Sequence, residues 1–304
     1  METIRNIHIQ TRGYSQENDY RWFRVQASDR KKPEFPDILT SFKDFNAQDI
    51  IDFQRPSIIL YRSGKFHFLL VTALESEPNR LDYMNRRIRN SVVWTFKDSV
   101  HSLENEKVIR EITILALRGE LDDLVDKCIQ NSEKEEDGFY VSFEKLSEIG
   151  QSFSFRNFVD SDANSKKMIG GDSKSIRDKL CDELSQSRLP RDNEGLLILT
   201  TTLKSKEYLQ ALPVWRGISS RFSTNDEWVV ISDANQGDQT VAPQKKKTPL
   251  IALCILILLT LTLILGMYLR IIPPNLEKDL PGQEENAEQT QIFNPQRMEI
   301  SMNQ

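Results

Sequence analysis

One uncharged apolar segment near the C-terminus constrains this 304-residue chain more than any other feature. Between Lys247 and Arg270 lie 22 residues without a charge, and leucine and isoleucine would occupy every face of a helix formed there. At about 1.5 Å per residue, such a helix is roughly 33 Å long, which matches the hydrocarbon core of a bilayer. A soluble core helix of this length would rarely lack every charge. The sequence therefore predicts a transmembrane helix over residues 248–270.

The residues that flank this segment predict its orientation. Lys245, Lys246 and Lys247 stand directly before it, whereas Arg270 and Lys278 are the cations soon after it, which favours a cytoplasmic N-terminal side. The N-terminal residues METIRNIHIQTRGY lack the apolar core of a secretory signal, and the three cysteines are spaced unlike a disulfide framework. We expect a bacterial inner membrane, with a eukaryotic tail anchor as the alternative.

The rest of the chain divides by composition. Residues 1–232 are long enough for one large domain or two small ones and are expected to lie in the cytosol. Residues 233–247 form a polar linker with a basic end. Residues 271–304 contain six Asp or Glu against two Lys or Arg, and we expect a disordered acidic tail there. The net charge of −5 gives no general reason to expect nucleic-acid binding.

Apolar periodicity within the first 232 residues predicts the fold class. Alternating patterns predict strands over residues 4–11, 20–27, 57–61, 65–73 and 92–96. Helical spacing follows over residues 103–129, with a break near Gly119, and over 174–187. Two later strands, 196–203 and 228–231, flank a short helix from residue 205. We therefore predict an α+β or mixed α/β domain with N-terminal antiparallel hairpins and later helices. A split into two domains near residue 135, at the polar segment EKEEDG, is the alternative.

Four arginines just before the predicted strand 92–96 form the most concentrated polar feature. They are Arg80, Arg86, Arg87 and Arg89. Guanidinium groups donate paired hydrogen bonds that suit phosphate and carboxylate groups, so this cluster is the candidate ligand site. The alternative is a solvated turn in which the arginines pair with neighbours such as Asp82.

Other chemical signals are weaker. Gly170 to Lys174 open a predicted helix whose N-terminal N–H groups could bind an anion. The P-loop spacing is absent, however, and N-capping of the helix by Asp172 or Ser173 explains the same residues. His101 lies beside serines and an aspartate, which are the residue types of a hydrolase triad. Local crowding of these residues is also typical of a polar turn, because a triad is assembled from separate segments. His8 and His67 fall in predicted strands, and Cys128 falls on an apolar helical stripe. The acids of ELDDLVDK spread over a helix, so we predict neither a metal nor a cofactor.

These features favour a membrane-anchored interaction or ligand-sensing module over an enzyme. The bilayer would be one partner, and a protein or a small phosphorylated ligand at the membrane would be another. Two alternatives remain. One is an anchored enzyme that acts on a phosphorylated or nucleotide-like substrate, with the arginines as anion ligands. The other is an effector whose span oligomerises and permeabilises the membrane, for which Thr260, Thr262 and Gly266 are mildly suggestive of helix packing.

Overall fold

The structure is a computed structural model that describes residues 4–231, apart from residues 30, 43–44, 98–102, 152–160, 163, 192–193 and 224. The predicted span, its flanking residues Lys245, Lys246, Lys247 and Arg270, and the acidic tail lie outside the described residues. Within those that are described, no helix has the length and apolar character needed to cross a bilayer. All of the described residues belong to one compact unit.

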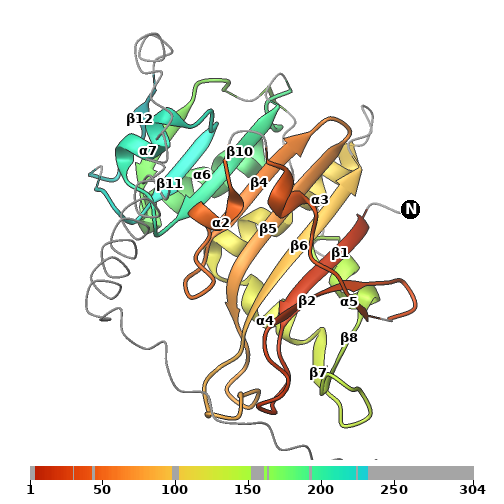
Figure 1. The fold of residues 1–304 in the computed structure, drawn as a ribbon. Helices are drawn as coiled ribbons and strands as arrows, with labels where there is room; N and C mark the ends of the chain where they lie inside the picture. The colour runs from red at the N-terminus through yellow and green to blue at the C-terminus, as the bar shows by residue number, and fades with distance from the viewer. Residues whose placement is uncertain are drawn as a thin grey trace, which may run out of the picture. The chain divides into compact units, whose positions relative to one another are not determined.

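A ten-stranded sheet forms the centre of this unit, in the order β12-β9-β11-β10-β4-β5-β6-β1-β2-β3 (Figure 1). Its strands along the chain are β1 (Ile4–Thr11), β2 (Arg21–Val25), β3 (Lys31–Pro33), β4 (Ile58–Ser63), β5 (Phe66–Glu75), β6 (Arg89–Lys97), β9 (Met168–Gly171), β10 (Gly195–Thr201), β11 (Arg216–Ser219) and β12 (Val229–Val230). A separate antiparallel pair joins β7 (Ile129–Asn131) to β8 (Phe139–Val141).

Helices cover both faces of the large sheet. They are α1 (Ile38–Ser41), α2 (Ala47–Ile50), α3 (Leu103–Arg118), α4 (Leu121–Asp126), α5 (Phe143–Glu148), α6 (Lys174–Gln186) and α7 (Lys206–Ala211). In the view of Figure 1, α3 and α6 lie behind the sheet, whereas α2 and α7 lie in front of it. Helices α3 and α6 pack against each other.

The sheet has an antiparallel part and a parallel part. Strands β1 to β6 pair antiparallel, as the alternating sequence patterns predict, and β4 and β5 form a tight hairpin. Strands β9, β11 and β10 pair parallel, because α6 and α7 carry the chain back before the next strand begins. Strand β10 joins the two parts by pairing antiparallel with β4. Residues before and after position 135 therefore share one sheet.

The two faces of the sheet bury two apolar cores. Alternation along β6 sends Val92 and Trp94 to one face and Val93 to the other, which is the period of two that a strand with both faces covered requires. The first core packs the sheet against α3, α4, α5 and α6, and Trp94 at its centre is fully buried. The second core packs the sheet against α1, α2 and α7.

This architecture confirms the predicted class, a sheet of mixed strand directions with helices. The break near Gly119 is also confirmed, because α3 ends at Arg118 and α4 begins at Leu121. Strands β3, β7, β8, β9 and β11 were not expected. Gly170 and Gly171, which the sequence analysis placed at the opening of a helix, lie inside β9.

Candidate functional site

Arg80, the first of the four clustered arginines, is buried, with 4% of its surface exposed. Its Nη1 lies 2.5 Å from Asp126 Oδ1, and its Nη2 donates to Thr11 Oγ1 at 2.8 Å. The other oxygen of Asp126 accepts from the backbone N–H of Glu77 at 3.0 Å. Arg80 therefore ties the segment of residues 76–88, which we call the arginine loop, to β1 and α4. Loss of one partner from such a buried pair leaves an uncompensated charge.

Arg86 lies at the surface of the arginine loop and is paired within its own turn. Its Nε and Nη2 donate to Asp82 Oδ2 at 3.0 and 2.8 Å. The other oxygen of Asp82 accepts from the backbone N–H groups of Met84 and Arg86. These contacts raise the pKa of Arg86, because the hydrogen bond with Asp82 favours its charged form. Asp82 therefore organises the turn, as one sequence interpretation proposed.

Arg87 and Arg89 also contact side chains of the protein. Arg87 Nη1 donates to Glu75 Oε2 at 3.2 Å, and Arg89 Nη1 donates to Gln54 Oε1 at 2.7 Å. A second nitrogen of Arg89 lies 3.5 Å from Glu75. None of the four arginines lines the cleft described below. Their role as ligand-binding residues stays a prediction.

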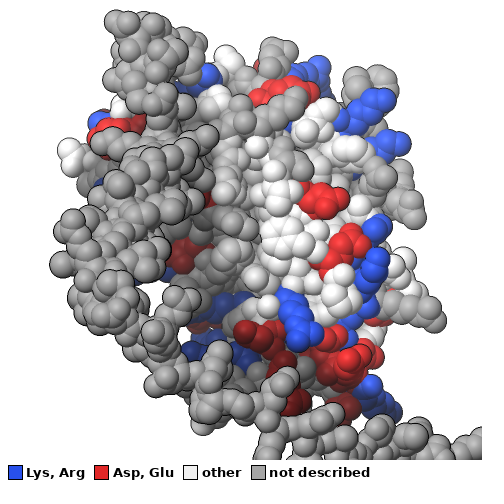
Figure 2. All heavy atoms as spheres, in the orientation of Figure 1, with Lys and Arg blue, Asp and Glu red and all other residues white. Residues whose placement is uncertain are grey.

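Aromatic side chains surround Arg12 beside the arginine loop, a feature that the sequence analysis missed. The guanidinium carbon of Arg12 lies 5.5 Å from the ring centre of Tyr20 and 5.0 Å from that of Tyr83. Tyr14 and Met84 are exposed in the same two loops. Tyrosine, methionine and arginine are enriched in protein interfaces. In the view of Figure 2, basic and acidic side chains are intermixed, so no patch of one sign dominates the face drawn there.

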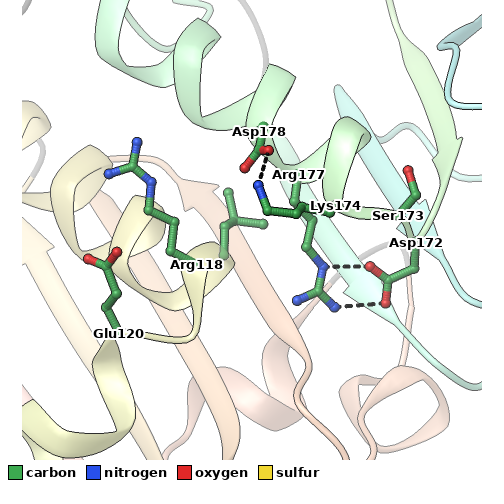
Figure 3. A pocket seen from close by; sticks show the side chains of 8 residues that line it. Arg118, Glu120, Asp172, Ser173, Lys174, Arg177 and Asp178 are labelled. Atoms are coloured by element: carbon green, nitrogen blue, oxygen red, sulfur yellow. Dashed lines mark hydrogen bonds and ion pairs between the residues drawn. The ribbon is translucent and has the colours of Figure 1, made fainter.

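A cleft of about 500 Å³ lies between the end of α3 and the first turns of α6 (Figure 3). Its volume is within the range of small-molecule sites. The cleft also lies beside the carboxyl end of β9, the edge where ligands commonly bind in sheets with parallel strands. The lining residues are Leu117, Arg118 and Glu120 on one side and Asp172, Ser173, Lys174, Arg177 and Asp178 on the other.

Two ion pairs organise the α6 side of the cleft. Arg177 donates to both oxygens of Asp172, at 2.6 and 2.8 Å, and these hydrogen bonds raise the pKa of Arg177. Lys174 Nζ donates to Asp178 Oδ2 at 2.7 Å, which raises the pKa of Lys174. Figure 3 shows both pairs at the start of α6, with Asp172 on the segment that leads into the helix. The Lys174 pair is solvated, because 90% of the lysine side chain is exposed.

Arg118 supplies a third cation from the α3 side. It is exposed, it hydrogen-bonds the thiol of Cys181, and no ion pair to it is found in the described part of the chain. Burial raises the pKa of Cys181 to about 11 in spite of Arg118, so this thiol stays protonated. Figure 3 shows Arg118 and Glu120 at the same end of the cleft without a contact between them. Arg118 is therefore the cleft cation best placed to meet a ligand.

Ser173 acts as the helix cap that the sequence suggested. Its hydroxyl accepts from the backbone N–H of Ile176 at 3.3 Å, which confirms N-capping of α6. A Cβ on Gly170 would lie 2.9 Å from Ile176 and 3.2 Å from Trp228. The glycine therefore allows α6 and the segment before β12 to approach β9, so close packing explains it without a bound phosphate.

The remaining sequence candidates have structural roles or fall outside the described residues. His101 is among the latter. His67 accepts a hydrogen bond from Arg62 Nε at 2.8 Å, and Cys128 is buried, which raises the pKa of its thiol to about 12. Asp122 accepts from the backbone N–H of Glu75 at 3.2 Å. No group of three or more potential metal ligands occurs within the described ranges.

Comparison of the chain with protein-family models, curated proteins and solved structures found no match.

Proposed function

We propose that this chain is a single-pass membrane protein whose N-terminal domain works in the cytoplasm as a ligand-sensing module. Residues 248–270 would be the anchor, and the cleft between α3 and α6 would be the ligand site. The anchor rests on the uncharged segment of the sequence. The observation that carries the sensing role is the cleft itself, because two elements distant in sequence bring three cations to one hollow of ligand size.

The cleft is lined by three cations and three carboxylates, and Arg118, which forms no ion pair among the described residues, favours a small phosphorylated ligand. Arg118 lines the cleft from the α3 side and Lys174 from the α6 side, so a phosphate bound between the two helices would meet both cations. Such a ligand must displace Asp178 from Lys174. This step is inexpensive, because an exposed ion pair contributes only about 0–1 kcal/mol. The bidentate Arg177–Asp172 pair would stay in place and fix the start of α6.

Ligand binding at this position would join the end of α3 to the first turn of α6. A ligand that binds the folded state raises its stability, by about 2.7 kcal/mol at a concentration 100 times Kd. Thermal unfolding of the full chain in detergent, followed by tryptophan fluorescence, therefore tests the proposal. The ligands are ATP, GTP and phosphorylated sugars, each compared with its unphosphorylated counterpart.

Two sets of variants assign the site. We expect Arg118→Gln to abolish the ligand-dependent rise in Tm, because Arg118 supplies a charge to the cleft. The double variant Arg86→Gln and Arg87→Gln removes charge from the arginine loop and should keep the rise. Loss of the rise in the double variant alone would move the site to the arginine loop. If no phosphorylated ligand raises Tm, the proposed ligand class is wrong. Melting without ligand shows that each variant is folded.

A further inference from the structure

The walls of the α3–α6 cleft are more polar than those of most small-molecule sites. Leu117 alone among the described lining residues has an apolar side chain, and it is 2% exposed. None of these described residues is aromatic. Ligand sites are usually lined by apolar and aromatic side chains with a few polar groups. The hydrocarbon of this cleft therefore belongs mainly to the stems of arginine and lysine side chains, whose charged ends stay in water.

Glu120 presents a hydrogen-bond acceptor at one end of the cleft. It is exposed and directly precedes α4, but its side chain does not cap that helix. No ion pair or hydrogen bond of this carboxylate is found within the described ranges. Because a carboxylate only accepts hydrogen bonds, this end of the cleft suits a ligand that donates them. Arg118 lies at the same end (Figure 3), so a cation and a free acceptor meet the ligand together.

Ligand binding would release a second acceptor on the α6 side. A phosphate that contacts Lys174 displaces Asp178, whose side chain is 50% exposed. The released carboxylate then accepts hydrogen bonds from the ligand. The hydroxyl of Ser173 accepts from the backbone N–H of Ile176, which leaves its own hydrogen for a ligand oxygen. The cleft thus offers acceptors from both sides and one neutral donor.

We propose that the α3–α6 cleft binds a phosphorylated sugar. Its phosphate would meet the two exposed cations of the cleft, and its hydroxyl groups would donate to Glu120 and Asp178. One compact ring carries several hydroxyl groups, so it reaches carboxylates on both sides, whereas a single ammonium group meets only one. The C–H groups of the ring suit the side-chain stems. This inference rests on the function proposed above and names the class of ligand.

Two matched phosphates test whether the hydroxyl groups contribute. Isothermal titration calorimetry of the full chain in detergent would compare glucose 6-phosphate with cyclohexylmethyl phosphate, which keeps a six-membered ring and the phosphate but lacks the hydroxyl groups. We expect glucose 6-phosphate to have a Kd at least about tenfold lower, which corresponds to about 1.4 kcal/mol. Equal Kd values would overturn the sugar and leave the phosphate site in place. If neither compound nor inorganic phosphate binds, the function proposed above fails, and the sugar fails with it.

Two other phosphates test different classes of ligand. AMP adds an adenine to ribose 5-phosphate, and the described lining residues offer no ring on which the base would stack. We therefore expect the Kd of AMP to be no lower than that of ribose 5-phosphate. O-phosphoethanolamine carries one ammonium group and no hydroxyl group, and it should bind more weakly than glucose 6-phosphate. Tighter binding of AMP than of ribose 5-phosphate, or of O-phosphoethanolamine than of glucose 6-phosphate, would overturn the proposal.

One variant with a matched control assigns the contact to the hydroxyl groups. Glu120→Ala should raise the Kd of glucose 6-phosphate about tenfold, because it removes a charged hydrogen-bond acceptor. It should not raise the Kd of cyclohexylmethyl phosphate, which has no hydroxyl group to lose a partner. Asp123→Ala removes an exposed carboxylate from the first turn of α4, outside the lining of the cleft, and should leave both Kd values unchanged.

The ratio of the two Kd values separates this contact from a structural effect. A structural effect of Glu120→Ala would raise both Kd values by the same factor, whereas loss of the contact raises only that of glucose 6-phosphate. An equal rise for both phosphates, or an unchanged Kd for glucose 6-phosphate, would contradict the assignment of Glu120 and overturn the proposed arrangement. Thermal unfolding without ligand shows that each variant is folded.

Discussion

His67 is held neutral by its surroundings, and this makes the stability of the domain depend on pH. The side chain lies in β5, is 3% exposed, and accepts a hydrogen bond from Arg62 Nε at 2.8 Å. Burial, together with the charge of Arg62, lowers the pKa of His67 from 6.5 to about 3. The unfolded chain therefore takes up a proton near pH 6.5 that the folded chain takes up only near pH 3.

Between these two pH values, the free energy of unfolding should fall as the pH decreases. One proton gives a slope of about 1.4 kcal/mol per pH unit. His67→Gln places a non-titrating acceptor near the position of Nε2, so it should reduce the slope by about this amount. Urea unfolding of the full chain in detergent, from about pH 7 to about pH 4.5, measures both slopes. Equal slopes in the two proteins would contradict the role assigned to His67.

Arg216 illustrates why the contacts of charged residues were harder to predict from the sequence than the fold, because its partner is distant along the chain. Arg216 is fully buried, forms an ion pair with Glu183 through two nitrogens, and lies over Trp215 with 4.1 Å between its guanidinium carbon and the ring centre. Glu183 is 33 residues away in the sequence. The sequence analysis instead selected Arg86 and Arg87 as candidate ligand residues, because arginines are concentrated in that segment. Both are exposed in a turn. A cluster of arginines is visible in the sequence itself, whereas a cleft depends on segments that meet only in the folded chain.

At the scale of elements, two glycines end helices in the same backbone conformation but in different surroundings. Gly119 follows α3 with φ +72°, and a Cβ there would meet nothing within 4 Å. Gly150 follows α5 with φ +84°, and its Cβ would lie 2.7 Å from Ile112 and 3.1 Å from the carbonyl oxygen of Val108. Both need the left-handed region that favours glycine. At Gly150 the close packing of α5 on α3 adds a second requirement.

Alanine at the two positions separates these requirements. Gly119→Ala should lower the free energy of unfolding by about 1–2 kcal/mol, the cost of a left-handed conformation for an L-residue. Gly150→Ala carries the same cost and must also displace Ile112, so we expect a further loss of about 1–3 kcal/mol. Chemical unfolding followed by circular dichroism measures the difference. Equal losses would show that α3 and α5 relax apart without penalty.

The strands that the sequence patterns missed are short and show little periodicity. Strand β9 is MIGG and β11 is RGIS, four residues each, and both lie inside the sheet. Such segments are too short for a period of two to stand out, and their glycines argue against a strand. Parallel pairing with each other and with β10 stabilises them instead. Long alternating strands such as β1 and β5 were predictable, because their own side chains define two faces.

At the scale of the whole molecule, the cleft and the arginine loop lie in different parts of one sheet. The α3–α6 cleft adjoins the carboxyl end of β9 in the parallel part. The arginine loop joins β5 to β6 in the antiparallel part. Helices α6 and α7 pack with opposite cores, so the parallel strands are covered on both faces. The segment that the sequence favoured and the cleft that the structure offers therefore belong to different parts of the fold.

The predicted anchor decides where these sites act, and removing it gives the most direct test of location. Deletion of residues 248–270 should move the chain from the membrane pellet to the supernatant, because no other segment of the sequence has 18 or more consecutive uncharged apolar residues. Resistance to extraction at high pH distinguishes a span from a surface contact. A deleted chain that still resists extraction would contradict the anchor.

Orientation requires a second measurement, in bacterial cells. An alkaline phosphatase fused after Gln304 should be active, since the enzyme folds only outside the cytoplasm, whereas a fusion at residue 240 without the span should be inactive. Lys245, Lys246 and Lys247 supply the charge bias, so replacing all three with glutamine should lower the activity of the fusion after Gln304. A control that replaces Lys204, Lys206 and Arg221 with glutamine removes the same charge from the domain and should leave that activity unchanged. An inactive fusion after Gln304, in a chain that still fractionates with the membrane, would place the domain on the outer side of the membrane.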